Sequence, residues 1–364
     1  MKRHEIRVEL GKRSYTVHIS GTLDAPSLRA VLAGRRAFIV SDRHVAACHL
    51  QELKQSLGQN CGVHLIKPGE RSKSLAVAEA LYTALAKWGA DRRTCLIALG
   101  GGVVGDLAGF VAATYMRGIP FIQIPTSLLA MVDSSVGGKV AVDHPRGKNL
   151  IGCFYQPESV WIAVGLLKTL PRRELSAGLA EVLKYGLIRD AKFFAWLEAN
   201  LDNILALEPA ALTHAIATSV RIKAGVVSKD EFETTGLRSI LNFGHTFAHA
   251  EELLSGYQGI LHGEAVAAGM VAALRLGAAV GPMQAARAAQ LTARLVALLE
   301  KAKLPVRLQH AGNFEAFFRA MQGDKKAEAG RVRFVLLKAL GRAGLPREVE
   351  EKAVAGVLRH TTQD

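Results

Sequence analysis

The sequence predicts an α/β fold with a mostly parallel sheet, followed by a largely helical C-terminal region. Two observations support this. Short β-rich or apolar segments alternate with helical segments through the first half, and the last third has helical character over most of its length. Such alternation is typical of βαβ units whose helices cover both faces of a sheet. Parallel sheets bind ligands where the strands end in loops, so we expect a site there.

The elements are expected in the following order. An N-terminal hairpin comes first, with strands at 5–10 and 14–20 around Gly11-Lys12-Arg13. The expected sheet strands are 36–41, 63–66, 94–99, 121–124 and 160–162, separated by helices such as 74–88. The expected later elements are helices at 174–188, 209–227, 237–254, 263–276 and 283–301, a lone strand at 333–337 and a final helix at 346–359.

Size and charge limit the possible functions. At 364 residues with 49% hydrophobic residues, the chain can form two domains with proper cores. The net charge of +14 implies attraction to anions. Lys and Arg are spread along the chain, and aromatics make up only 6% without alternating with basic residues. We therefore expect a phosphorylated metabolite and a phosphate-bearing cofactor, and no nucleic acid.

Several patterns predict a cytoplasmic location with no membrane partner. The N-terminus MKRHEIRVEL has no apolar stretch behind its basic residues, so no secretory signal is expected. The small apolar run at 265–274 stops at Arg275, well short of a bilayer span. The four cysteines are scattered without a C-x-x-C pair, which suits a reducing compartment and argues against a thiolate metal site.

Three histidines gather in the stretch 236–264. His245 and His249 are four residues apart, so a helix would place them on one face, and His262 follows a glycine-containing loop. Imidazoles at such spacing can bind a divalent metal if a carboxylate arrives from elsewhere. On spacing alone, two surface histidines and one core histidine remain an equal alternative.

A glycine-rich loop, Gly100-Gly101-Gly102-Val103-Val104-Gly105-Asp106, follows the strand at 94–99. Glycines let backbone N–H groups approach a pyrophosphate, and the following helix adds the positive end of its dipole. The register departs from G-x-G-x-x-G, so a plain tight turn is a comparable alternative. Asp42, at the end of the first sheet strand, is either a ribose acceptor or an ordinary N-cap.

The segment 125–139 combines Asp133 among apolar neighbours with several hydroxyls, and it ends in Gly137-Gly138-Lys139. Arg146, Lys148 and Asn149 follow shortly after. A lysine on a glycine loop is positioned by the backbone, and this favours an anion site over a purely structural element.

With these residues in view, the chain resembles the 3-dehydroquinate synthase family from about Asp42 to Gly341. The resemblance rests on PGERSK, GGGVVGD, RG at 117–118, PTSLLAMVDSSVGGK, GKNLIG, FYQP, TLPRREL, GLAEVLKYG, GLRSILNFGHT, HGE and DKK at 324–326. It implies a homodimer with a Rossmann-like NAD domain at 1–170 and an all-helical metal- and substrate-binding domain at 171–364. It also implies a shikimate-pathway lyase that converts 3-deoxy-D-arabino-heptulosonate 7-phosphate to 3-dehydroquinate and phosphate.

The resemblance assigns a role to each motif residue. The metal, zinc or cobalt, would be held by Glu181, His245 and His262, while His249 moves from the metal to the substrate. The implied NAD contacts are Asp42, Glu70, Lys73, Gly101, Gly102, Asp106, Thr126, Ser127, Asp133, Lys148 and Thr169. The implied substrate contacts are Lys139, Asn149, Lys184, Lys223, Arg238, Asn242, His249, one of Lys325 or Lys326 (Lys326 is preferred), and Arg117 from the other subunit.

The sequence departs from the family pattern at a few places. Ala163 stands where Asp is common, Ala248 replaces a Gly, Gly225 replaces a Glu, and one extra residue lies within 230–236. The inserted residue makes Lys223 and Arg238 the substrate contacts most open to revision. The alternatives are a cyclase acting on glucose 6-phosphate or sedoheptulose 7-phosphate, a polyol dehydrogenase of related fold, and a basic nucleic-acid-binding protein.

Overall fold

The structure, a computed structural model, describes residues 3–58, 61–323 and 332–363, with side chains described up to residue 359. Contacts divide the chain into two compact units. Unit 1 comprises Met1–Leu170 and Pro209–Ser228, and unit 2 comprises Pro171–Glu208 and Lys229–Asp364. The second domain expected from the sequence, 171–364, includes residues 209–228, whereas their contacts group them with unit 1.

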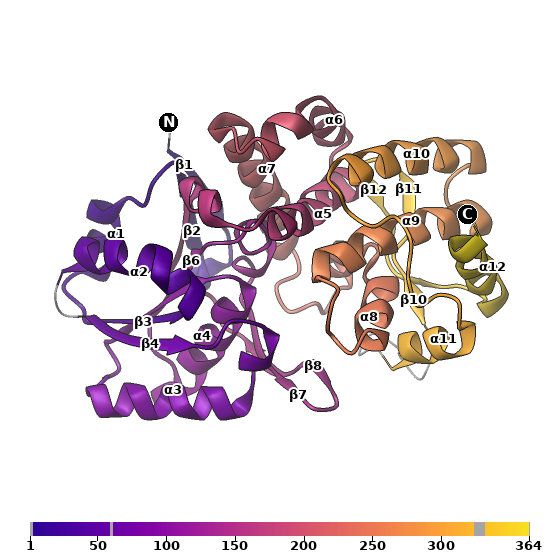
Figure 1. Ribbon diagram of the computed structural model, residues 1–364. Helices are drawn as coiled ribbons and strands as arrows, with labels where there is room; N and C mark the ends of the chain where they lie inside the picture. Colours follow the sequence, from indigo (N-terminus) through magenta and orange to yellow (C-terminus); the bar gives the residue numbers. More distant parts are fainter. Residues whose placement is uncertain (1–2, 59–60, 324–331, 364) are drawn as a thin grey trace. The chain divides into compact units, whose positions relative to one another are not determined.

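Unit 1 is built on a seven-stranded sheet of order β1-β2-β9-β6-β5-β3-β4 (Figure 1). Its strands are β1 His4–Val8, β2 Tyr15–Ser20, β3 Ala37–Asp42, β4 Cys61–Ile66, β5 Cys95–Gly100, β6 Phe121–Pro125 and β9 Ser159–Ala163. β1 and β2 form the expected antiparallel hairpin, and the other neighbouring strands are parallel. The predicted mostly parallel sheet is therefore confirmed.

Alternate side chains of the central strands face opposite layers, because successive residues of a strand point to opposite faces. In β3, Phe38 and Val40 join the core under α3 (Leu75–Trp88) and α4 (Gly102–Thr114). Ala37 and Ile39 join the core under α1 (Ala25–Leu32) and α2 (Arg43–Leu57). Both faces of the sheet are thus covered by helices (Figure 1).

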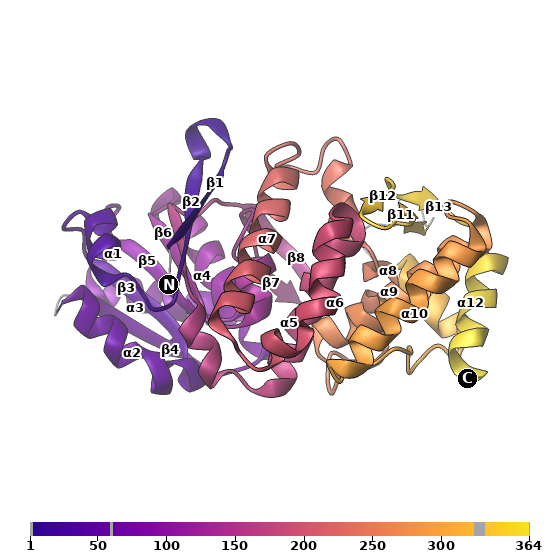
Figure 2. The same ribbon diagram turned by 90° about the horizontal axis from the view of Figure 1, so that it is seen from above.

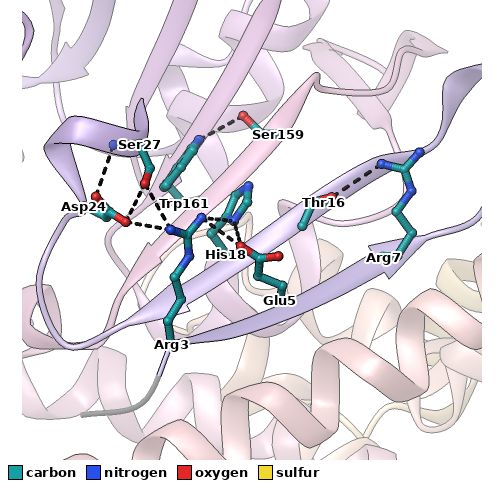
Figure 3. Close-up of polar contacts among 9 residues, drawn as sticks. All are labelled: Arg3, Glu5, Arg7, Thr16, His18, Asp24, Ser27, Ser159 and Trp161. Atoms are coloured by element: carbon teal, nitrogen blue, oxygen red, sulfur yellow. Dashed lines mark hydrogen bonds and ion pairs between the residues drawn. The ribbon is translucent and has the colours of Figure 1, made fainter. Parts of the chain in front are cut away.

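The N-terminal hairpin is tied to the rest of unit 1 by Arg3 (Figure 3). Its guanidinium donates to Asp24 Oδ2 at 2.8 Å and to Ser27 Oγ at 3.0 Å, and it lies 2.9 Å from His18 Nδ1. His18 stacks on Trp161 of β9 with ring centroids 4.0 Å apart. Burial and the nearby Arg3 charge lower the pKa of His18. These contacts fix the antiparallel end of the sheet.

The remaining elements of unit 1 surround the strand ends. They are the 3-10 helices Gly11–Arg13, Glu70–Ser72, Tyr115–Arg117 and Val164–Thr169, the π-helix Ala130–Ser134, the hairpin of β7 (Lys139–His144) and β8 (Gly147–Phe154), and α7 (Pro209–Val227). α7 packs against β1, β2 and the π-helix; Figure 2 labels α7, β1 and β2.

Unit 2 is a helical bundle around α9 (His262–Val280), which contacts α5, α8, α10 and α12. Its other elements are α5 (Arg172–Arg189), α6 (Ala191–Leu205), the 3-10 helix Leu237–Asn242, α8 (His245–Leu254), α10 (Ala285–Lys301), α11 (Phe314–Gln322), β10 (Arg333–Phe334), β11 (Leu337–Ala339), β12 (Arg342–Ala343), β13 (Arg347–Glu348) and α12 (Glu351–Gln363). Among the described residues, α9 alone is long and apolar enough to span a membrane, but it is mostly buried, as a core helix is.

Three details of unit 2 differ from the sequence predictions. The prediction of a single helix at 237–254 is wrong, because Gly244 has a left-handed φ of 81° and separates the 3-10 helix from α8. The strand expected alone at 333–337 is two short strands, β10 and β11, paired with β13 and β12. The last helix begins at Glu351, five residues later than expected, because Arg347 and Glu348 pair with β10.

Candidate functional site

Unit 2 brings one carboxylate and two imidazoles together. Glu181 lies in the middle of α5, while His245 and His262 are the first residues of α8 and α9. Glu181 Oε1 lies 3.6 Å from His245 Nε2 and 3.7 Å from His262 Nε2. The three ligand atoms lie within 4.8 Å of one another, and no other such group of three occurs in the part of the chain that the structure describes.

The hydrogen bonds of the two histidines select the nitrogen that faces Glu181. His245 Nδ1 lies 3.2 Å from the Phe243 carbonyl oxygen, and His262 Nδ1 lies 3.3 Å from Glu252 Oε2. Carbonyl and carboxylate oxygens only accept, so each Nδ1 carries the proton. Each Nε2 is therefore left with its lone pair directed toward Glu181, as a metal ligand requires.

The dimensions of this group fit a divalent cation. Tetrahedral ligands each about 2.1 Å from zinc lie about 3.4 Å from one another, close to the distances above. Glu181 is fully buried, so its negative charge needs a positively charged partner. Lys184, one turn along α5, forms an ion pair with it. Two imidazoles and a carboxylate are a donor set for zinc or a similar transition metal.

His249 lies beside this group but is not part of it. Its ring centroid is 5.5 Å from that of His245 and 6.4 Å from that of His262. The i, i+4 spacing correctly placed His245 and His249 on one helix, yet the helix of His262 supplies the second imidazole. Contact of His249 with a substrate stays a prediction.

Arg238 binds its own chain segment. It is 2% exposed, its Nη1 donates to the Glu231 carbonyl oxygen at 2.5 Å, and its Nε lies 3.9 Å from Glu233. Asp230 accepts the Arg238 backbone N–H at 2.9 Å. The segment with the extra residue thus folds around Arg238, and Asn242 ends the 3-10 helix that follows.

In unit 1, the strand order reverses between β3 and β5, since the chain passes from β3 outward to β4 and then returns to the other side of β3. Such a switch point is where open α/β sheets bind ligands. Asp42 ends β3, and its Oδ1 caps α2 by accepting the N–H groups of His44 and Val45 at 2.8 and 3.0 Å. The N-cap interpretation is confirmed, and ribose binding by Asp42 stays a prediction.

The glycine loop follows β5 at this switch point. Gly101 is the N-cap of α4, so the helix starts within the loop and its first N–H groups point out of it. A Cβ on Gly102 would lie 3.2 Å from Ser134 Oγ, and one on Gly101 would lie 3.5 Å from Ser127 Oγ. The loop therefore packs against the predicted anion-binding segment 125–139.

A second polar group lies in the same unit. The buried Lys73 ammonium donates to Asp106 Oδ2 at 2.6 Å and to Asn149 Oδ1. Burial alone would lower the pKa of Lys73, but the charges of Asp106 and Glu70 outweigh it and raise that pKa. Asn149 has a left-handed φ of 53° and donates its backbone N–H to Asp143 at 2.8 Å. Two residues expected to bind NAD and one expected to bind substrate are thus joined in one network.

The other predicted residues are arranged as follows. Lys223 donates to the Asp133 carbonyl oxygen at 2.7 Å and to its Oδ1 at 2.6 Å, joining a predicted substrate contact to a predicted NAD contact. Two further predicted NAD contacts have polar partners: Lys148 Nζ lies 3.5 Å from Glu70 Oε1, and Thr169 Oγ1 lies 2.7 Å from His49 Nε2.

The remaining predicted residues are described by their exposure or backbone. Thr126 is buried, Lys139 is exposed at the start of β7, and Arg117 has a left-handed φ of 67°. Lys325 and Lys326 lie outside the described residues.

The three substitutions relative to the family pattern are at positions outside the group of candidate ligands. Ala248 is fully buried in α8, and Ala163 is buried at the end of β9. Gly225 is exposed on α7, and a Cβ there would meet no atom within 4 Å. None of the three changes removes a candidate ligand.

Sequence reasoning missed Glu252. It lies seven residues after His245 and three after His249, so these three residues share one face of α8. The pattern H-x-x-x-H-x-x-E was visible in the sequence and predicts a carboxylate next to the histidines.

The fold and site define a two-unit protein with a dinucleotide-type sheet in one unit and a candidate metal centre in the other. Residues 63–177 match the family model for the N-terminal domain of 3-dehydroquinate synthase, and residues 178–327 match the model for its C-terminal domain. The chain belongs to the 3-dehydroquinate synthase family.

Individual relatives agree with this assignment. The chain is 49% identical to 3-dehydroquinate synthase from Methylococcus capsulatus over 98% of both chains. Among solved structures, 2-epi-5-epi-valiolone synthase from Streptomyces hygroscopicus with bound NAD+ and Zn2+ is 28% identical, with a TM-score of 0.88 and 98% of each chain covered. A 2-deoxy-scyllo-inosose synthase complexed with carbaglucose-6-phosphate, NAD+ and Co2+ is 27% identical, with a TM-score of 0.86, covering 98% of this chain and 100% of the other.

Proposed function

We propose that this chain is a 3-dehydroquinate synthase of the shikimate pathway. It converts 3-deoxy-D-arabino-heptulosonate 7-phosphate to 3-dehydroquinate and phosphate. The observation that carries the proposal is the 49% identity to a synthase of this name over 98% of both chains. The cyclitol synthases of similar fold are only 27% and 28% identical, which favours the heptulosonate substrate.

The cofactors are NAD and a divalent cation, Zn2+ or Co2+. Glu181, His245 and His262 would hold the cation, and their geometry supports this assignment. The glycine loop and Asp42 at the switch point of the sheet would hold NAD. When bound, the cation would lower the pKa of a substrate hydroxyl, and NAD would accept a hydride from that carbon and later return it to the substrate.

The protein's own residues bind and orient the substrate. Its carboxylate and phosphate carry about three negative charges at neutral pH, and burying them unpaired would cost several kcal/mol per charge. Lys139, Lys184, Lys223, Arg238 and Lys326 supply positive charge, Asn149, Asn242 and His249 supply hydrogen bonds, and Arg117 of a second copy completes the set. The phosphate itself takes the proton in the elimination, so the protein supplies no strong base there, and positioned cations orient and neutralise the departing phosphate.

Elimination of phosphate, return of the hydride, ring opening and an intramolecular aldol closure complete the reaction. The overall change releases phosphate with no net oxidation, so NAD is regenerated in each turnover. A cytoplasmic homodimer is part of the same proposal.

The decisive experiment incubates the purified protein with zinc or cobalt, the heptulosonate phosphate and trace NAD. We expect equal amounts of phosphate and 3-dehydroquinate, without accumulation of NADH. Glucose 6-phosphate and sedoheptulose 7-phosphate serve as parallel substrates. Turnover of either one in preference to the heptulosonate, or NADH formed in step with product, would overturn the proposal.

A further inference from the structure

Glu252 places a second carboxylate next to the candidate metal centre. Its side chain is only 5% exposed, and its Oε2 lies 3.3 Å from Nδ1 of His262. It belongs to α8, the helix that begins with the ligand His245, whereas His262 begins α9. α8 therefore supplies one candidate ligand, His245, and through Glu252 also contacts a second candidate ligand, His262 of α9.

The two histidines are held by unlike acceptors. His245 donates its Nδ1 proton to a neutral backbone carbonyl, and His262 donates its Nδ1 proton to a carboxylate. A hydrogen bond to a charged acceptor is stronger and makes the opposite nitrogen a better donor to a metal. It also fixes the rotation of the ring about its bond to Cβ.

We propose that Glu252 is the positioning residue of the metal centre. It keeps His262 as the Nδ1-protonated tautomer with Nε2 directed toward Glu181. The negative charge of Glu252 offsets part of the positive charge that a bound divalent cation and the neighbouring Lys184 would bring to the site. This inference rests on the metal binding included in the proposed function.

The neighbouring residue is a matched control. Glu251 is also buried and also contacts a histidine, since its Oε1 lies 2.8 Å from His310 Nδ1. It accepts the backbone N–H groups of Gln309 and His310 at 3.0 and 3.2 Å. Glu251 therefore fastens the chain at 309–310, and it is outside the group of candidate ligands. Substituting Glu251 therefore shows how the loss of a buried glutamate that contacts no candidate ligand changes metal affinity and the unfolding temperature.

The experiment measures zinc and cobalt affinity by competition with a chromogenic chelator in the full-length protein. We expect Glu252→Ala to lose about 10- to 100-fold in affinity, as second-layer substitutions do. Glu252→Gln keeps an acceptor oxygen without the charge, so we expect a smaller loss. Glu251→Gln should remain within about twofold of wild type, with unfolding temperatures measured for all variants.

A second readout separates positioning from general stability. The ¹⁵N shifts of His262 in the zinc-loaded wild-type protein should report a protonated Nδ1 and a metal-bound Nε2, and the cobalt absorption spectrum should change in both Glu252 variants. If Glu252→Ala does not fold, Glu252→Gln decides by the same measurements. Wild-type affinity and unchanged spectra in Glu252→Gln would overturn the inference and leave the proposed function standing. A wild-type protein that binds neither metal would overturn both.

Discussion

The backbone of α9 at Gly263 lies directly against the carbonyl group of Ala177 in α5. A Cβ placed on Gly263 would come within 1.9 Å of the Ala177 oxygen and 2.5 Å of its carbonyl carbon. Gly263 follows the candidate ligand His262, and Ala177 lies one helical turn before the candidate ligand Glu181. This close approach therefore sets the distance between two of the three candidate ligands.

Gly263→Ala should separate α5 from α9 and disturb the geometry of the candidate metal centre. Because the contact is with backbone atoms, no side-chain rotation can relieve it, and we expect a loss of about 1–3 kcal/mol in the free energy of unfolding. We also expect zinc affinity to fall at least tenfold. Urea unfolding and chelator competition measure the two effects.

Gly277→Ala is the control on the same helix. A Cβ at Gly277 would meet only Pro282 Cγ at 3.9 Å, an ordinary contact, so this variant should be neutral or slightly more stable. Equal effects of the two substitutions would contradict the argument from close approach.

Asp230 should make the free energy of unfolding fall as the pH is lowered into the acid range. Burial raises the pKa of its carboxyl, but hydrogen bonds from the backbone N–H groups of Arg238 and Thr235 outweigh it and lower that pKa. A lowered pKa in the folded state gives stability that is complete above the unfolded pKa of about 3.9 and is lost as pH falls through the folded value.

We therefore expect Asp230→Asn to destabilise the protein at neutral pH, with the difference from wild type shrinking below about pH 4. Thermal unfolding between pH 3 and 7 measures it. Asp202→Asn is the control, because the Asp202 side chain is 73% exposed and pairs only at the surface with Lys301. A pH-independent difference for Asp230→Asn would contradict the assignment of this carboxylate as an ionised acceptor.

The sequence predicts the sheet well, because strand patterns are local. The alternation of β3 side chains between two helical layers follows from a period of two residues. Likewise, the spacing of His245 and His249 correctly predicts one helix for both. These features depend on residues close together in the chain.

Features that depend on distant parts of the chain could not be predicted. Gly244 interrupts the expected helix through its left-handed φ of 81°, and a Cβ there would also come within 2.8 Å of the backbone nitrogen of Met270, so the position requires glycine. The pairing of Lys223 with Asp133 joins residues 90 positions apart. No local pattern indicates either contact. Glu181 was assigned to the metal site only by the family resemblance, because family motifs carry information about contacts between distant residues.

Lys139 tests the assignment of the phosphate site. It is exposed at the start of β7, so its removal should cost little stability. We expect Lys139→Ala to lower turnover of the heptulosonate phosphate on the order of a hundredfold or more, because one positioned cation is lost. Zinc and NAD affinities should be retained. Lys12→Ala, in the exposed turn of the N-terminal hairpin, is the charge-matched control. Near-normal turnover of Lys139→Ala would place the phosphate elsewhere.

Gly225 gives a stability prediction that is independent of catalysis. It lies inside α7 on an exposed position, two residues after Lys223, and a Cβ there would meet no atom within 4 Å. Glycine inside a helix costs about 0.5–1 kcal/mol relative to alanine, because the unfolded chain has more conformations to lose. Gly225→Ala should therefore raise the free energy of unfolding by about that amount, measured by urea titration. Since its backbone is already helical and its surroundings are open, a loss of stability would mean that the surface of α7 at this position is covered in the assembled protein.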